Sequence, residues 1–245
     1  MNDYKDNFYN NYNTSHILGR KGAPSIVEFK GRSRIYDKHF GKHLPKDKNV
    51  ELVDIGCGNG SVVWWLQQKG YSKTIGIDIS QEQIEAGKKL EVNNLIPSDI
   101  IKYLQNKNDK FDIIIARDVI EHFKKNETVE LLNLCYQSLK NGGKILLQVP
   151  NGESPFFGRI RYGDFTHEIA FSQSSLQQLL KMSGFNKVEC YSAEVIAVNI
   201  QSFLRLVVWK VFESIIRLIL FSEVGKSQSK RIVTQNIIAV ATKAD

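Results

Sequence analysis

Paired cysteines are missing from this sequence. Cys57, Cys135 and Cys190 lie far apart in the 245-residue chain, and no two of them form a Cys-x-x-Cys motif. This spacing argues against a disulfide framework and against a zinc site. We therefore expect a protein of a reducing compartment.

The chain also lacks an apolar stretch at its beginning. Its first residues read MNDYKDNFYNNYNTSH, a polar and aromatic run. A secretory signal needs an apolar core there, so we expect none and expect the protein to be cytoplasmic. Internal repeats are missing too, and compositional bias is confined to the Asn- and Tyr-rich first dozen residues.

The composition is that of a soluble globular domain, with 42% hydrophobic and 24% charged residues. A chain of 245 residues can bury a substantial core as one domain with elaborations. The net charge of +7 suits a phosphate-bearing substrate, a nucleic acid or an anionic membrane. It suits equally well a basic surface that has no specific partner.

Short apolar runs alternate with helical patterns between residues 50 and 149. Such an alternation predicts an α/β fold, in which right-handed crossovers build a parallel sheet covered by helices on both faces. We expect the strands at 50–54, 74–78, 94–100, 111–116 and 143–149, and helices at 61–70, 80–92 and 127–143, the last of them stopped by Asn141-Gly142-Gly143.

The pattern changes after Pro150. A Gly-rich loop leads to a helix expected at 172–183, and strands are expected at 187–193 and 232–242. Between these two strands lies a long apolar segment, 200–221.

Three alternating glycines follow the first expected strand, in the stretch LVDIGCGNG. Gly56, Gly58 and Gly60 permit positive φ and let a ligand approach the main chain. The helix that begins near Ser61 adds unpaired N–H groups. A nicotinamide dinucleotide prefers Gly-x-Gly-x-x-Gly, and the carboxylate of Asp54 would repel its pyrophosphate. The same carboxylate could receive a cationic amino group, directly or through water.

An acid followed by Gly-x-Gly-x-Gly resembles motif I of the class I S-adenosylmethionine-dependent methyltransferases. Four further stretches continue the resemblance over residues 48–190, namely GIDIS, PSDII, KFDIIIARDVIEHF and LKNGGKILLQVPN. It implies S-adenosyl-L-methionine as cofactor and a Rossmann-like sheet of seven strands, mostly parallel with the last strand antiparallel.

The resemblance also assigns roles to single residues. Asp78 would accept both ribose hydroxyls, and Ile79 would lie against the adenine. Asp99 matches the position that bonds the adenine amino group, with Ile100 beside it. Asp99 could instead simply begin a turn after Pro97. The end of the fourth strand, with Arg117, would face the methionine part of the cofactor.

We expect four segments along the chain. Residues 1–45 form an N-terminal arm and helix that act as a lid, and residues 46–199 form the methyltransferase core. An amphipathic helical insertion follows at 200–225, and 226–245 supply the last strand of the sheet.

A hydroxyl acceptor requires a base, and the loop RYGDFTHEIAF overhangs the acceptor side. His167, with Asp164 to orient it, is the first candidate, and His122 at the end of the fourth strand is the second. A structural role is open for both histidines. Arg159 and Arg161 could clamp a phosphate, although exposed arginines are common. The carboxylates of Asp118, Glu121 and Asp164 could converge there on a metal, but nothing in the spacing demands one, so we expect no metal.

The other three histidines carry weaker expectations. His39 and His43 are expected to be exposed at a helix end, and His16 lies in the N-terminal arm, where a lid role has no support in the sequence.

The segment 200–221 reads as a helix that lies on a membrane surface. Its charged residues, Arg205, Lys210, Glu213 and Arg217, fall within an arc of roughly 140° and leave a broad apolar face. Four charges make spanning costly, whereas Trp209 and three cations suit an anionic interface. A dimer seam and a cap over the active site remain the alternatives.

The loop and the inserted helix resemble a bacterial subgroup associated with surface-glycan assembly, including capsule and O-antigen. This implies O-methylation of a sugar hydroxyl or a phosphorylated group on a glycan precursor. A quinone or other lipid-soluble phenol is the alternative acceptor, and a non-catalytic cofactor-binding subunit is a further one. We expect no nucleic acid, because the fourth strand ends in Ala-Arg-Asp-Val rather than in an Asn/Asp-Pro-Pro motif.

Overall fold

A seven-stranded sheet organises the computed structural model, which describes residues 8, 24–225 and 231–244. The strand order is β3-β2-β1-β4-β5-β7-β6. All neighbouring strands are parallel except β7, which runs antiparallel to both β5 and β6. The strands are β1 (Leu52–Ile55), β2 (Thr74–Asp78), β3 (Leu95–Pro97), β4 (Phe111–Arg117), β5 (Leu139–Pro150), β6 (Lys187–Ser192) and β7 (Asn236–Thr242). This confirms the expected fold class.

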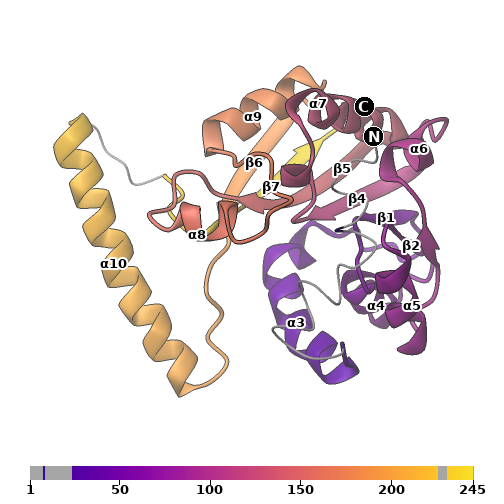
Figure 1. The fold of residues 1–245 in the computed structure, drawn as a ribbon, viewed down its shortest axis with the longest axis horizontal. Helices are drawn as coiled ribbons and strands as arrows, with labels where there is room; N and C mark the ends of the chain where they lie inside the picture. Colours follow the sequence, from indigo (N-terminus) through magenta and orange to yellow (C-terminus); the bar gives the residue numbers. More distant parts are fainter. Residues whose placement is uncertain (1–7, 9–23, 226–230, 245) are drawn as a thin grey trace.

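Helices cover both faces of the sheet (Figure 1). One face carries α3 (Ile26–His39), α4 (Ser61–Gln68) and α5 (Gln81–Lys89), and the other carries α6 (Ile100–Leu104), α7 (Lys125–Ser138) and α9 (Gln173–Met182). The short helix α8 (Phe157–Arg161) lies in the loop after β5, and α10 (Ile200–Val224) stands apart from the body of the molecule. Two 3-10 turns complete the described elements, η2 (Gly41–His43) and η3 (Ile120–His122).

The central strands are buried because their sequences are continuously apolar. In β4, the residues from Ile113 to Ala116 are all at most 3% exposed, as expected of a parallel strand covered on both faces. Helix α7 adds Leu131 and Leu132 to one core cluster, and α4 adds Trp65 to the cluster on the opposite face. The chain progression reverses direction between β1 and β4, and ligands of such folds bind outside the carboxyl ends of the strands at this point.

Three expected boundaries were wrong. The expected strand 94–100 ends at Pro97, and Ile100 begins α6 because Asp99 caps that helix through its Oδ1. Asn141-Gly142-Gly143 does not stop a helix but lies inside β5, where the register with β4 shifts. The last strand begins at Asn236 rather than at 232.

Helix α3 belongs to the core layer rather than to a detached lid. Phe29 and Tyr36 are at most 1% exposed, and the Tyr36 hydroxyl pairs with Ser61 Oγ of α4 at 2.8 Å. Of the preceding arm, only Phe8 is among the described residues, and its ring stacks on Phe165 with centroids 5.6 Å apart. The lid role of residues 1–23 therefore stays a prediction.

Helix α10 is the expected insertion between β6 and β7, and it is 25 residues long. Asn199 caps its first turn, since Oδ1 accepts from the Ser202 N–H at 2.8 Å. Gly225 ends it in the left-handed conformation, with φ of 68°. Across the described part of the chain, no helix has the length and apolarity to cross a bilayer.

Candidate functional site

The glycine turn lies at the carboxyl end of β1, at the point where the sheet reverses its order. Gly56, Gly58 and Gly60 all have positive φ, between 54° and 78°. A Cβ on Gly56 would lie 2.4 Å from Cγ2 of Val119, so the main chain packs tightly there. A Cβ on Gly58 would meet nothing nearer than Gln83 Oε1 at 3.8 Å, which leaves room for a ligand beside this residue.

Asp78, at the end of β2, stabilises this turn through hydrogen bonds to the main chain. Its Oδ2 accepts the Gly58 N–H at 2.7 Å, and its Oδ1 accepts the Ser80 N–H at 2.8 Å. Each carboxylate oxygen has a further lone pair. The sequence-predicted ribose acceptor is therefore also the residue that holds the cofactor turn in shape.

Asp54 is buried at the base of the turn, with 2% of its surface exposed. Burial raises the pKa of this carboxyl from 3.8 to about 8, although Arg117 opposes the shift. The group is therefore largely uncharged near neutral pH, which the sequence did not predict. A cation placed against it would favour the ionised form.

Arg117, at the end of β4, contacts helix α3 through its side chain. Its guanidinium donates to the Tyr36 hydroxyl at 3.0 Å and lies 3.3 Å from Asp118 Oδ2. Asp118 itself adopts φ of 57°, a strained conformation for a residue with a side chain. Gln148 of β5 donates to both Asp118 oxygens, at 2.9 and 3.0 Å, and so stabilises the bend.

The residues expected beside adenine line the neighbouring strand ends. Ile79 follows Asp78 and is 45% exposed, so its apolar surface is accessible to a flat ring. Asp99 uses one oxygen to accept the Lys102 N–H at 2.8 Å, and Ile100 is 8% exposed. The capping role that the sequence left open for Asp99 is thus present, and its contact with adenine stays a prediction.

His167 lies on the loop that follows α8, on the acceptor side. Its Nδ1 is 3.0 Å from the Ile160 carbonyl oxygen. Because a carbonyl only accepts, Nδ1 carries the proton and the lone pair lies on Nε2. Burial lowers the pKa of His167, which keeps the ring neutral near pH 7.

His122, on η3, is held in the same tautomer through a relay. Its Nδ1 is 2.8 Å from Thr166 Oγ1, and this hydroxyl donates to Asp164 Oδ1 at 2.7 Å. The predicted carboxylate therefore orients His122 through Thr166, whereas the expected direct pairing of Asp164 with His167 is replaced by the Ile160 carbonyl. The two imidazole rings meet edge to face, with centroids 4.6 Å apart.

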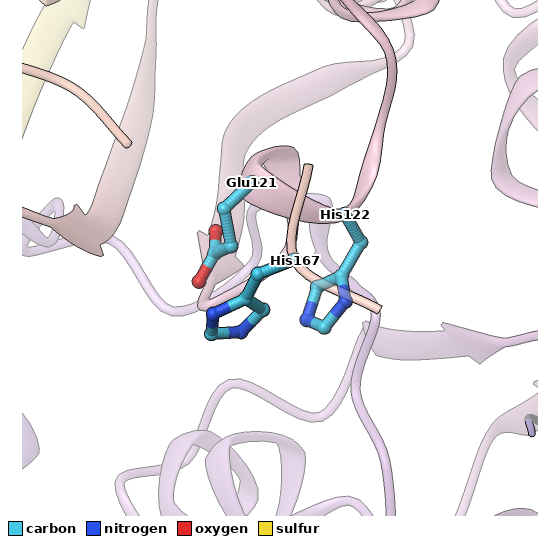
Figure 2. A group of neighbouring side chains, drawn as sticks. All are labelled: Glu121, His122 and His167. Atoms are coloured by element: carbon cyan, nitrogen blue, oxygen red, sulfur yellow. The ribbon is translucent and has the colours of Figure 1, made fainter. Parts of the chain in front are cut away.

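Glu121 completes this cluster (Figure 2). Sequence analysis named it only as one of three carboxylates that could converge on a metal, and did not place it with the two histidines. It is 0% exposed, and among the described residues neither carboxyl oxygen has a hydrogen-bond partner. Burial raises its pKa well above the usual range. Glu121, His122 and His167 each offer one ligand atom within 4.8 Å of the others. A divalent cation could bind there, and the expectation of no metal stays a prediction.

The two arginines before the loop differ. Arg161 donates to the carbonyl oxygens of His167 and Glu168, the second at 2.6 Å, and so shapes the loop. Its expected place in a phosphate clamp is therefore taken by main-chain contacts. Arg159 is exposed on α8, and its contact with a substrate stays a prediction.

Neither His39 nor His43 is part of this cluster. His39 was expected to be exposed, but it is only 9% exposed because α3 packs into the core. His43 lies on η2, and His16 lies outside the described residues. A second missed residue is Gln83, which is 3% exposed and whose Oε1 has no partner in the described ranges.

Comparison with known proteins identifies the family of this chain. A family profile described as "Methyltransferase domain" matches residues 30–190. A tRNA U34 carboxymethyltransferase of Desulfotalea psychrophila is 26% identical over 153 residues, 58% of this chain and 47% of that protein. A ubiquinone biosynthesis O-methyltransferase of Rickettsia akari is 33% identical over 114 residues, 44% of this chain and 42% of that protein. The chain thus spans about half the length of the curated relatives it matches.

Solved structures agree in fold. A SAM-dependent methyltransferase from Archaeoglobus fulgidus has a TM-score of 0.63 at 24% identity, covering 98% of this chain and 100% of that one. A phosphoethanolamine N-methyltransferase 2 of Haemonchus contortus, in complex with S-adenosylhomocysteine, has a TM-score of 0.62 at 15% identity, covering 97% and 60%. With the family profile, the sheet order and the glycine turn in agreement, the chain belongs to the class I S-adenosylmethionine-dependent methyltransferase family.

Proposed function

We propose that this protein transfers a methyl group from S-adenosylmethionine to a hydroxyl oxygen, with His167 as the general base. The observation that carries the proposal is the fixed tautomer of His167. Its Nδ1–H is held by the Ile160 carbonyl, which leaves the Nε2 lone pair for the acceptor proton. The histidine lies on the loop that overhangs the carboxyl end of the sheet, where ligands of such folds bind.

The chain's own residues fit the cofactor. When bound, S-adenosylmethionine supplies an electrophilic methyl group on a positively charged sulfur. Asp54 would ionise against the cationic amino group of the cofactor, directly or through water, and Asp78 would accept from the ribose while it keeps the Gly58 turn in place. The unpartnered oxygen of Gln83 beside Gly58 gives the cofactor a further acceptor.

The acceptor that we favour is a lipid-soluble phenol of the quinone-precursor type. A phenol has a pKa of about 10, so a neutral imidazole can accept its proton far more readily than that of an aliphatic sugar hydroxyl. Tyr162 and Phe165, both on the acceptor loop, are 75% and 74% exposed and offer aromatic surface to such a ring. The relatives named for ubiquinone biosynthesis agree with this choice. The glycan precursor that the sequence suggested has no counterpart among these relatives.

A divalent cation provides a second route to the same reaction. Bound by Glu121, His122 and His167, it would lower the pKa of the acceptor hydroxyl directly and give the buried Glu121 carboxylate a partner. In this case His167 would be a ligand rather than a base.

The test is methyl transfer from radiolabelled S-adenosylmethionine by the purified full chain. We expect a dihydroxybenzoate with a hydrophobic tail to be methylated, and a nucleotide sugar or bulk tRNA not to be. Methylation of tRNA alone would overturn the proposal. Turnover that survives exhaustive chelation favours the base, whereas turnover restored only by added Mg²⁺ or Zn²⁺ favours the cation.

A further inference from the structure

Helix α10 turns its charged side toward the protein body, whereas a surface helix usually turns its apolar side inward. Its least exposed residues, Ser202 and Glu213, mark the side that faces the rest of the molecule, and they are 8% and 6% exposed. Glu213 binds Lys210 at 3.0 Å and Arg217 at 2.8 Å, so charge gathers on this side. Lys210 also binds Glu194, in the loop before the helix, at 3.2 Å.

The opposite side of α10 is apolar and uncovered. At about 100° per residue, an arc of roughly 180° opposite Glu213 contains no charged residue. The large side chains on this arc are between 46% and 80% exposed, except for Phe212 at 37%, and they are Ile200, Leu204, Val207, Val208, Val211, Ile215, Leu218 and Ile219. At about 1.5 Å per residue the 25-residue helix extends roughly 37 Å, so this apolar face is far longer than a chance patch.

The apolar face continues toward the acceptor loop. Phe156, just before α8, stacks on Phe212 of α10 with ring centroids 5.9 Å apart and planes 12° apart. Figure 1 shows α8 as the part of the body that lies beside α10. Phe156 and Phe157 are themselves 47% and 40% exposed, and the loop that follows ends at His167. One uncovered surface therefore joins the inserted helix to the acceptor side of the site.

Charge indicates what covers this surface. Residues 200–231 contain six lysines and arginines against two glutamates, which is a net charge of +4 out of the chain's +7. A second copy of the chain would bring an equal positive charge against the first. Anionic lipid headgroups would instead neutralise the positive charge that the ion pairs of Glu213 and Glu194 leave in excess, while the acyl region covers the apolar face.

We propose that α10 lies in the interface of an anionic membrane, with its charged side toward the protein body and its apolar side toward the lipid. Phe156 and Phe157 share this contact. The membrane thereby presents a lipid-soluble acceptor to the loop of His167, and this last step rests on the proposed function. Association with the membrane itself does not.

Vesicle co-sedimentation of the full chain tests the proposal. We expect binding to phosphatidylcholine vesicles that contain phosphatidylglycerol, and at least about tenfold weaker binding to phosphatidylcholine alone. The double variant Val208→Glu/Val211→Glu should also lose at least about tenfold, because two exposed valines leave the apolar face. Val27→Glu on α3 and Met182→Glu on α9 are matched controls, since both wild-type side chains are 80% exposed on other elements, and they should bind as the wild type does.

Two results would overturn the proposal. One is equal sedimentation of the double variant and the wild type, given that both retain the same affinity for S-adenosylmethionine as a check of folding. The other is a stable dimer in light scattering that the double variant converts to a monomer. The methylation of a short-chain phenol in solution is independent of both, so its loss reports on the proposed function rather than on membrane binding.

Discussion

Asp54→Asn should stabilise the free protein while it weakens cofactor binding. In the folded chain burial raises the pKa of Asp54 from 3.8 to about 8. Between these two pH values the unfolded chain releases the proton and the folded chain keeps it. Folding stability therefore falls as pH rises through this window, by about 1.36 kcal/mol per pH unit. An asparagine has no such proton to keep.

The magnitude follows from the width of the window. At pH 7 the distance from 3.8 is 3.2 units, which corresponds to about 4 kcal/mol of destabilisation that the variant lacks. For a chain of this length such a difference moves the melting temperature by on the order of 10 °C. Cofactor affinity should fall by about 10- to 100-fold, because a charge-assisted contact with the bound cation is lost.

Urea unfolding at pH 5, 6, 7 and 8, followed by tryptophan fluorescence, measures the first effect, and calorimetry with S-adenosylmethionine measures the second. The stability advantage of Asp54→Asn should widen with pH up to about 8 and then level off. Asp47→Asn, at an exposed aspartate, is the matched control and should leave the pH dependence unchanged. A variant that runs parallel to the wild type at every pH would falsify the burial argument.

Other substitutions test the turn and the base. Asp78→Ala should lower S-adenosylmethionine affinity in calorimetry by at least about tenfold, since it removes both the ribose acceptor and the Gly58 anchor. His167→Gln should reduce kcat by about 10²–10⁴-fold and leave cofactor affinity unchanged. The rate of the wild type should decline at acidic pH, because the imidazole ring protonates at or below its lowered pKa. Turnover of the variant at the wild-type rate would eliminate His167 as the base. Gly56→Ala should destabilise the protein more than Gly58→Ala in urea unfolding, because only the former places Cβ 2.4 Å from Val119. Equal losses would show that strain in φ, rather than this contact, sets the cost.

The positions of the candidate cofactor residues in the fold could be predicted from local sequence. Asp54, the three glycines and Asp78 occupy strand ends, and parallel strands bring their ends to one edge of the sheet. Local sequence could not give the ionisation of Asp54, which depends on its burial in the folded chain and on Arg117 of β4 and Asp78 of β2. The Asn-Gly-Gly stretch was wrongly predicted to end a helix. Glycines that end helices also permit irregular strand pairing, which is what they do at the start of β5.

The acceptor half was less predictable because its contacts are tertiary. His122 and His167 were singled out from their loops, but the edge-to-face meeting of their rings depends on how the loop after α8 folds back. Glu121 could be named from the sequence as a possible metal carboxylate, but only the tertiary packing reveals its complete burial. Arg161 looked like a phosphate ligand because nothing in its sequence shows that the loop carbonyls bind it.

The position of α10 in the chain has a consequence for how such a protein can diversify. Ser192 of β6 pairs with Ile237 of β7, so these two strands form an ordinary antiparallel pair. Residues 193–235 connect them. Lengthening a connection costs little, about 0.6 kcal/mol for each doubling. Asn151 secures the returning strand by donating to the carbonyls of Ile232 and Thr234. The sheet can therefore accept a different connection in place of this helix without altering a single strand.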